Sequence, residues 1–330
     1  MSSIEAFTAD HVGAAGDLLA ARQRELRATR PELPAAFEEA DAHRPGLEEL
    51  LGEEGSHGVI ALDGGRPAAF LVGFHRTQEI WGRAAWSPIS GSAADPALRI
   101  AGGELLRDCY AAWSRHFVER GVFRHYVHAP VDAAEERAWF NTGFGRMQAH
   151  AVRDLAPLAG EDPPGIEIRP ATPDDLDAIM PLAPLIANQL VGPPAWAITL
   201  PEGYRTHRPD WADELANPDG PLLLALEDGR AIALAGFGEA APGPMVPHGA
   251  WELGIGMTLP EARGRGIQRA LLRRGLALAA EAEATHVETD WRTASLVTAR
   301  TWTALGFVPT HHRLHRHVDE RVAWATGAKD

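Results

Sequence analysis

Residues 250–272 read AWELGIGMTLPEARGRGIQRALL, and this stretch decides the fold. An apolar, strand-like segment runs into a turn rich in glycine and arginine, and the apolar spacing after that turn predicts a long helix. The first turn of a helix carries unpaired N–H groups and a partial positive charge, so it attracts phosphate. Gly264 and Gly266 let a ligand approach the backbone closely. The stretch therefore predicts a phosphate-binding loop.

The spacing of this loop differs from that of two common phosphate loops. A Walker loop needs Gly-Lys-Ser/Thr, and the single lysine of the chain is Lys329. A Rossmann loop needs Gly-x-Gly-x-x-Gly, whereas an arginine stands where the third glycine would be. Arginine supplies the positive charge here, because its planar fork forms paired hydrogen bonds with phosphate oxygens. The arginines of the loop are Arg263, Arg265 and Arg269.

The loop lies in the second of two related halves of the chain. Three short segments recur in the same order, at offsets of 164, 164 and 163 residues. Three such matches in one order indicate an internal duplication. The pairs are Phe7–Val12 with Ala171–Leu176, Ala61–Arg66 with Ala225–Arg230, and Arg137–Phe144 with Arg300–Phe307.

A segment rich in proline and glycine, without an apolar period, separates the halves and is predicted to be a linker. We expect a first domain over 1–157, a linker over 158–165 and a second domain over 166–330. Each half has the same predicted order of strand, helix, β-hairpin, strand, long helix, strand, helix and final strand, which is typical of a mixed α/β fold. The early helices are predicted over about 11–28 and 174–190, the hairpin turns at 63–65 and 227–229, and the long helices over about 97–119 and 266–283.

Two segments of the second half resemble the motifs of a known family. Arg263-x-x-Gly266-x-Gln268 is similar to the R/Q-x-x-G-x-G/A motif of the GCN5-related N-acetyltransferases (GNATs), and 290–307 is similar to the second signature of that family. The resemblance covers 166–317 and extends through the duplication to the first half. It implies two tandem GNAT-like domains with mixed, largely antiparallel sheets, and an acyl-CoA co-substrate, most simply acetyl-CoA. The implied cofactor-binding residues are Met257, Thr258, Leu259, Arg263, Gly264, Arg265, Gly266, Ile267, Gln268, Arg269 and Ser295.

Three residues depart from the family pattern. Gln268 stands where the family usually has Gly or Ala, so its side chain is expected to crowd the pyrophosphate. Ser295 replaces the usual Asn of the second motif. Trp302 stands where many members have the tyrosine that protonates the departing thiolate, and an indole cannot supply that proton. Tyr204, the only tyrosine of the second half, is the alternative acid, and water is another source of the proton.

Acyl transfer to an amine also needs a group that accepts a proton from the incoming ammonium, and a carboxylate can do this. Glu252, on the predicted strand before the loop, is the first candidate. Glu288 and Asp290 alternate to one face of a neighbouring predicted strand and are the second candidates. For each of the three, the alternative is a solvated surface acid. The resemblance also implies that backbone N–H groups of about Gly256–Thr258 polarise the acyl carbonyl.

The first half lacks the phosphate loop. When 105–107 is aligned with 271–273, Ala97–Gly102 falls opposite Arg263–Gln268 and retains only its final glycine from the pattern. We therefore expect the first half to be a degenerate acyltransferase-like domain with a structural or substrate-shaping role.

Composition excludes several classes of protein. The 330 residues are 45% hydrophobic and 23% charged, as in ordinary globular domains. Cys109 is the only cysteine, which excludes intrachain disulfides and thiolate metal clusters. The formal net charge of −14 repels phosphate backbones and anionic lipid, so we expect neither nucleic acid nor a membrane as partner.

Further observations bear on location and on metals. The N-terminal sequence lacks the pattern of a secretory signal, and no apolar run is long enough to span a membrane, so we expect a cytoplasmic protein. We expect no metal, because the histidines near the C-terminus have no carboxylate or cysteine close by in the sequence. These histidines are His311, His312, His315 and His317.

The sequence predicts an acyl-CoA-dependent N-acyltransferase whose acceptor is a small-molecule amine or a peptide N-terminus and attacks the thioester directly. Two other classes stay open. A non-catalytic acyl-CoA binding or sensing module is favoured by the three departures from the family pattern. A structural protein that has lost the cofactor from both domains is disfavoured by the intact Arg263, Gly264 and Gly266. O-acylation on the same scaffold is also open, and 186–219, where acceptor loops are expected, contains no recognisable motif.

Overall fold

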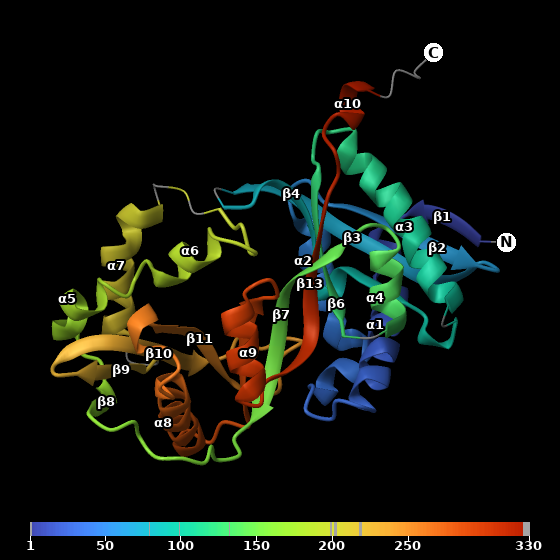
Figure 1. The fold of residues 1–330 in the computed structure, drawn as a ribbon. Coiled ribbons are helices and arrows are strands. Elements are labelled where there is room, and N and C mark those ends of the chain that lie inside the picture. Colours follow the sequence, from blue (N-terminus) through green and yellow to red (C-terminus); the bar gives the residue numbers. More distant parts are fainter. Residues whose placement is uncertain are drawn as a thin grey trace. The chain divides into compact units, whose positions relative to one another are not determined.

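A computed structural model describes residues 2–78, 80–98, 100–131, 133–198, 200, 203–217 and 220–325, with 100, 133 and 203–206 described by their backbone alone. Contacts between residues divide the chain into two compact units, whose elements are drawn in Figure 1. Unit 1 comprises Met1–Ala149, Gly243–Met245 and Pro309–Asp330, and unit 2 comprises His150–Pro242 and Val246–Val308.

Unit 1 is a mixed sheet with helices on both faces. Its strand order is β1-β2-β3-β4-β6-β13, and β5 pairs with β3. All of its described strand pairs are antiparallel except β4 with β6, which is parallel. The strands are β1 (Ser2–Ala6), β2 (His57–Asp63), β3 (Arg66–Gln78), β4 (Gly82–Ser87), β5 (Ser92–Ala94), β6 (Arg124–Pro130) and β13 (Val308–His317). The helices are α1 (Val12–Arg27), α2 (Arg44–Gly52), α3 (Ile100–Val118), α4 (Ala133–Phe140) and α10 (Val322–Ala325).

Two apolar cores flank the sheet of unit 1, because successive strand residues point to opposite faces. Leu71 of β3 belongs to the core that contains Trp113 of α3. The preceding residue, Phe70, belongs to the other core, which contains Leu19 of α1 and Leu47 of α2. All five of these side chains are buried completely. Unit 1 therefore has three layers, with the sheet in the middle.

Unit 2 repeats this architecture, again with five described helices. Its strand order is β7-β12-β11-β10-β9-β8. Gly275 of α8 packs directly on Phe237 of β10, since a Cβ at Gly275 would lie 2.1 Å from the ring. The strands are β7 (Gly145–Asp154), β8 (Ile166–Pro170), β9 (Leu222–Glu227), β10 (Arg230–Glu239), β11 (Trp251–Thr258) and β12 (His286–Arg292). The helices are α5 (Leu176–Ile179), α6 (Leu185–Leu190), α7 (Gly203–Ala216), α8 (Ile267–Glu281) and α9 (Leu296–Ala304).

The local signals predicted from the duplication are present in both units. The backbone N–H of Thr8 donates to His11, and that of Thr172 donates to Asp175, so both threonines begin helical turns as predicted. Two-residue turns join β2 to β3 and β9 to β10, with positive φ at Gly64 and Gly65 and at 228–229. These backbone angles match the type of turn that joins twisted antiparallel strands.

The single helix predicted over 174–190 is wrong. The chain forms the short helices α5 and α6 there instead, with a turn between them. Pro181 and Pro184 lie in or next to that turn. Proline has no N–H to donate and clashes with the preceding helical turn, so the apolar spacing alone was misleading.

The last strand of each sequence half lies in the unit formed mainly by the other half. β13, at the end of the chain, pairs with β6 in unit 1 from His311 to His317. β7, at the end of the first half, extends into unit 2, where its neighbour is β12. In unit 2, Arg153 of β7 donates to the Leu305 carbonyl at 2.7 Å. In unit 1, the guanidinium of Arg316 of β13 lies 5.4 Å from the centre of the Tyr110 ring. The two terminal strands are therefore exchanged.

Candidate active site

The site begins where β11 separates from β12. The two strands pair in parallel at Trp251–Val287 and Glu252–Glu288, and β11 then continues to Thr258 without a further described pair to β12. On its other edge, the pairing of β11 with β10 shifts at Gly254, which has no partner of its own. Such a bulge bends a strand and disrupts its ladder. The backbone of Gly256–Thr258 therefore lies on a strand edge that opens away from its neighbour.

The predicted phosphate loop follows β11 and has the conformation that an anion site requires. Gly264 and Gly266 have φ of 77° and 79°, in the left-handed region. A Cβ at either position would meet nothing within 4 Å, so this part of the surface is open. Gly266 precedes α8, and no side chain caps that helix. The N–H groups of its first turn have no helical partner and are suited to bind pyrophosphate oxygens.

Three arginines surround this helix start. Arg263 donates to the Thr258 carbonyl and to the Gln189 side chain, each at 3.3 Å. Arg265 forms a two-fold hydrogen-bonded ion pair with Glu227, and the shorter of its bonds is 2.6 Å. Arg269 is exposed. A bound phosphate would therefore compete with Glu227 for Arg265, while Arg263 and Arg269 lie nearer to solvent.

Gln268 does not crowd the loop, contrary to the expectation from its size. Its side-chain amide turns inward and donates to the carbonyls of Leu234 and Met257, at 3.1 and 2.8 Å. It also donates to the Thr258 hydroxyl at 3.0 Å. The side chain thus ties β10 to β11 and leaves the loop surface to the backbone. Three other predicted cofactor residues are buried, so only their backbones can face a ligand; these are Met257, Leu259 and Ile267.

Ser295 and Trp302 come from the second motif, Ser295 immediately before α9 and Trp302 within it. Ser295 is buried immediately before α9 and accepts a hydrogen bond from Gln189 at 2.8 Å. Trp302 is buried in α9, and its ring lies so close to Gly256 that a Cβ there would be 2.9 Å from the indole. Gln189 of α6 therefore links Arg263 to Ser295. The role of Gln189 could not be predicted from the sequence, because this glutamine lies outside every recognised motif.

The carboxylate candidates gather on the exposed side of β11 and β12. Glu252 and Glu288 are direct neighbours across the two strands, and Asp290 follows two residues later on the same face. Desolvation, followed by the charges of Asp290 and Glu214, raises the pKa of Glu252. Desolvation, with the charges of Glu252 and Asp290, raises the pKa of Glu288 to about 7. Tyr204 lies in α7, and its side chain is outside the described residues.

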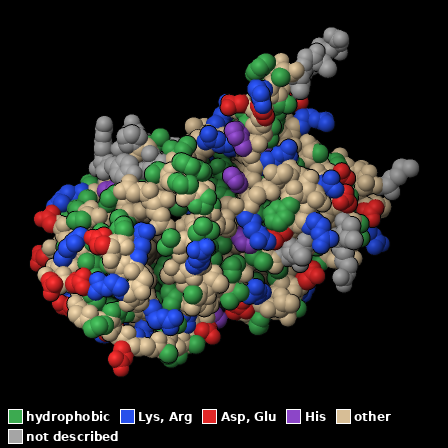
Figure 2. Space-filling model, in the orientation of Figure 1, with side chains coloured by type: hydrophobic (Ala, Val, Ile, Leu, Met, Phe, Trp, Pro, Cys, Tyr) green, Lys and Arg blue, Asp and Glu red, His purple; other side chains and the backbone are tan. Residues whose placement is uncertain are grey.

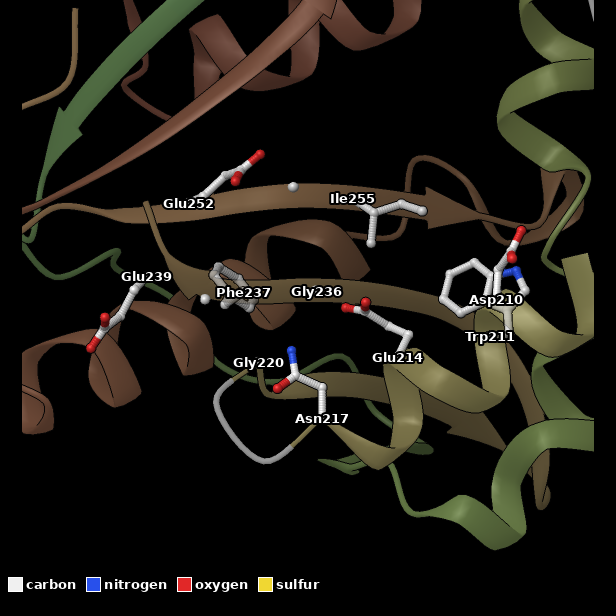
Figure 3. A pocket seen from close by; sticks show the side chains of 12 residues that line it. Asp210, Trp211, Glu214, Asn217, Gly220, Gly236, Phe237, Glu239, Glu252 and Ile255 are labelled. Atoms are coloured by element: carbon white, nitrogen blue, oxygen red, sulfur yellow. The ribbon is translucent and has the colours of Figure 1, made fainter. Parts of the chain in front are cut away.

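A cavity of about 510 Å³ opens beside Glu252, between α7 and the strands β10 and β11 (Figure 3). Its volume is within the range of about 300–1,000 Å³ typical of small-molecule sites. Sequence reasoning missed its α7 side chains. The spacing of Asp210, Glu214 and Asn217 at i, i+4 and i+7 is the signal that could have placed them on one helix face. The lining residues are Asp210, Trp211, Glu214, Asn217, Gly220, Gly236, Phe237, Gly238, Glu239, Glu252, Gly254 and Ile255.

The corresponding place in unit 1 has different chemistry. There β4 and β6 pair in parallel, with Trp86 opposite Tyr126, and the pairing continues through the last residue of β4. The two rings are stacked, with centroids 4.1 Å apart. In the described part of the connection between β4 and α3, no glycine has a positive φ.

In the part of the chain that the structure describes, no group of three or more His, Cys, Asp or Glu side chains is placed to hold a metal ion. His311 and His312 are buried in β13, and His312 forms a 2.6 Å hydrogen bond with Glu136. None of the described helices combines the length and apolar character needed to cross a membrane.

The second half is similar to a known family. The model of the acetyltransferase (GNAT) family matches residues 194–307, which contain the loop, the opened strand and α9. No curated protein matches the sequence. The family uses acyl-CoA, and the uncapped helix start with its two left-handed glycines fits the pyrophosphate of that molecule.

Solved structures show the same fold across the rest of the chain. A GCN5-related N-acetyltransferase from Sphaerobacter thermophilus is 20% identical, with a TM-score of 0.58, over 95% of this chain and 94% of that one. A fungal GCN5-related glucosamine N-acetyltransferase region, within a multi-domain β-N-acetylglucosaminidase, is 14% identical with a TM-score of 0.53, over 96% of this chain and 38% of that one. A tandem GNAT protein from the clavulanic acid pathway is 16% identical with a TM-score of 0.48, over 96% and 97%. The first two structures show that the mixed α/β fold is GNAT-like over nearly the whole chain, as predicted.

Proposed function

We propose that unit 2 binds an acyl-CoA, most simply acetyl-CoA, and transfers its acyl group to the nitrogen of an amine. The observation that carries this proposal is the arrangement along β11. The glycine loop and the uncapped start of α8 follow one end of the strand, and the carboxylate of Glu252 stands at the other. An anion site and a proton acceptor on one opened strand are what acyl transfer from a CoA thioester to an amine requires.

Three sets of groups in the chain take part in this reaction. The loop backbone, with Arg263, binds the pyrophosphate. Backbone N–H groups of Gly256–Thr258 stand where they can polarise a carbonyl oxygen. Glu252 accepts a proton from the ammonium group of the acceptor, so that the neutral amine attacks the thioester directly. Desolvation, followed by the charges of Asp290 and Glu214, raises the pKa of Glu252 and makes it a stronger base.

The departing thiolate receives its proton from water or from Tyr204 in this proposal. Trp302 has no acidic proton to give, and its ring is buried against Gly256. A thiol has an ordinary pKa near 8.5, so a thiolate at neutral pH can be protonated without a dedicated acid. The missing tyrosine is therefore compatible with turnover.

The charge of the protein favours a cationic acceptor over nucleic acid or anionic lipid. The net charge is −14, and on the face shown in Figure 2 the arginine side chains are interspersed with acidic ones rather than gathered in a stripe. A small-molecule amine or a peptide N-terminus fits such a field. We place the protein in the cytoplasm on its sequence alone.

Calorimetric titration with acetyl-CoA tests the binding half of the proposal. We expect one site per chain, and loss of binding by at least about 100-fold in Gly266→Glu, which puts a negative charge at the anion site. Gly65→Glu is the matched control, since Gly65 has a φ of 81° and equally open surroundings in a turn of unit 1. Normal binding by Gly266→Glu, or no binding by the wild-type chain below millimolar concentration, would refute the proposal.

A second candidate function is binding of acyl-CoA without catalysis. The burial of Trp302 at the position of the family's acid favours it. An assay of CoA release across a panel of amines separates the two functions. Tight acetyl-CoA binding without release on any amine would support the second candidate.

A further inference from the structure

The cavity beside β11 contains more negative charge than one proton transfer needs. Four of its lining side chains are carboxylates, and none of them forms an ion pair with a described residue. Other carboxylates of unit 2 do form ion pairs, such as Asp175 with Arg169 and Glu227 with Arg265. The cavity carboxylates are Asp210, Glu214, Glu239 and Glu252. Their charge is available to a ligand.

Glycine provides the room for that ligand. Gly236, Gly238 and Gly254 line the cavity on the side of the strands. A Cβ at Gly236 would lie 2.9 Å from Ile255 and 4.0 Å from a carboxylate oxygen of Glu214. The Glu214 carboxylate therefore lies over the backbone of Gly236, which has no side chain to fill the space. Larger side chains at these positions would fill the space between α7 and the strands.

The carboxylates are spread along the cavity rather than gathered at one point. In Figure 3, Glu239 and Glu252 lie at one end, Asp210 and Trp211 lie at the other, and Glu214 lies between. Glu252 and Ile255 are three residues apart on β11, which corresponds to roughly 10 Å along a strand. The ring of Trp211 adds an aromatic surface, and aromatic rings attract cations. The cavity can therefore hold two positive charges in separate places.

We propose that the acceptor is an aliphatic amine with at least two cationic groups, one acylated beside Glu252 while another binds at Asp210 and Glu214. This inference rests on the proposed function, because it assigns the acceptor of that same site. When an amine with a single charge binds beside Glu252, Asp210 and Glu214 have no cationic group to bind. The same is true of a peptide N-terminus with neutral side chains.

The chemical step balances with the groups named. Glu252 takes one proton from the nearer ammonium group. The resulting amine nitrogen forms a bond to the acyl carbon while the carbon–sulfur bond breaks, and the nitrogen loses its second proton to solvent. CoA leaves as a thiolate and takes up a proton from water. The distant ammonium group keeps its charge throughout and is held by Asp210 and Glu214.

Two matched amines test the proposal by their charge alone. Putrescine and aminobutanol have the same chain length, and only putrescine carries a second ammonium group; spermidine extends the series. With acetyl-CoA and the full chain, we expect kcat/KM for putrescine or spermidine to exceed that for aminobutanol by about tenfold or more, because two partly solvated charge contacts are gained.

Variants then locate the second charge. In Asp210→Asn combined with Glu214→Gln, we expect the advantage of the better polyamine over aminobutanol to fall to about twofold. The ratio of the two kcat/KM values is the readout, because Glu214 also raises the pKa of Glu252 and its loss affects both amines. Asp213→Asn is the matched control, because Asp213 is an exposed acid on the same helix that does not line the cavity. It should keep the full advantage. Titration of each amine in the presence of CoA provides a second readout that needs no turnover.

Equal kcat/KM for all three amines would overturn the inference and leave the proposed acyltransferase standing. So would an advantage that the double variant retains. If no amine is acetylated, calorimetry decides: polyamine binding that the double variant weakens supports the inference, and equal binding of polyamine and aminobutanol overturns it. A chain that does not bind acetyl-CoA would instead refute the proposed function itself.

Discussion

Unit 1 and unit 2 share one strand arrangement and present opposite chemistry at the same place. In unit 2 the parallel pair is Glu252 with Glu288, next to a bulge and an opened strand edge. In unit 1 it is Trp86 with Tyr126, whose stacked rings lie on strands that stay paired to the end of β4. The difference shows that the framework is independent of the site. Pairing and core packing hold the sheet, and a few side chains with two glycines decide whether it offers a ligand site.

The largest effect is expected on kcat, from substitution of Glu252 in the acidic pair of unit 2. Glu252→Gln keeps the shape of the side chain but cannot accept a proton. We expect kcat to fall about 100-fold, as is usual on loss of a general base, while the Kd for acetyl-CoA stays unchanged. Steady-state kinetics and calorimetry measure the two quantities. Glu281→Gln, an exposed acid of α8, is the control. Full activity of Glu252→Gln would transfer the role to Glu288 or Asp290.

Substitution of Trp86, in the aromatic pair of unit 1, should lower the free energy of unfolding and leave the binding of acetyl-CoA unchanged. Trp86→Ala removes a ring that stacks on Tyr126 and also contacts Trp81. We expect the free energy of unfolding of unit 1 to fall by about 2–3 kcal/mol, the lower part of the range for deleting a large aromatic side chain, because Trp86 is only half-buried. Thermal unfolding and acetyl-CoA titration test this. A changed acetyl-CoA affinity or stoichiometry would show that unit 1 contributes to the cofactor site.

The free energy of unfolding should depend on pH because of Glu288, the partner of Glu252 in the acidic pair of unit 2. Glu288 has a folded pKa of about 7, against an ordinary 4.5 for the unfolded chain. Between these values the folded state binds more protons, so stability falls as pH rises through this window and stays low above it. Glu288→Gln removes the penalty. We expect the unfolding free energy to rise by about 1–2 kcal/mol at pH 8, and to change little at pH 4.5.

The control for this pH dependence is Tyr126→Phe, the corresponding change in unit 1, which removes no carboxyl group. Its effect on Tm should be the same at both pH values. An effect of Glu288→Gln that does not vary with pH would mean that this carboxyl group is not held neutral in the folded protein.

The smallest effect is expected at Ser295, which replaces the family's asparagine. Its hydroxyl contacts Gln189 and Thr298, so its influence on the cofactor is indirect. We expect Ser295→Ala to change the KM for acetyl-CoA by less than about threefold. Gln189→Ala is tested separately, because Gln189 also accepts a hydrogen bond from Arg263. A loss of tenfold or more would indicate direct contact between Ser295 and the cofactor.

Much of this architecture follows from short-range signals in the sequence. The threonines at positions 8 and 172, the two glycine turns and the Gly-Arg loop each act within a few residues, and the structure has them as predicted. Side-chain direction was harder to predict. Gln268 turns inward because carbonyls of β10 and β11 need a donor, and nothing local to α8 shows that need. The acidic cavity likewise depends on how α7 lies on β10.

Strand exchange could not be predicted for a related reason. An alternating pattern fixes which side chains face the core, and it does not say which neighbour the strand will pair with. β7 and β13 each carry an arginine near the end, Arg153 and Arg316, and each arginine contacts a residue of the unit in which it lies. Such contacts form only once the strand has paired, so the sequence of the strand alone does not indicate its neighbour.

The exchanged strands also bear on why a half without the phosphate loop persists. If the chain were cut within 158–165, each fragment would end in a strand that belongs to the unit built mainly by the other. Neither fragment could close its sheet alone, and each would expose an unpaired edge. Because the first half supplies part of β7 to unit 2, a substitution that unfolds the first half is expected to disturb unit 2 as well.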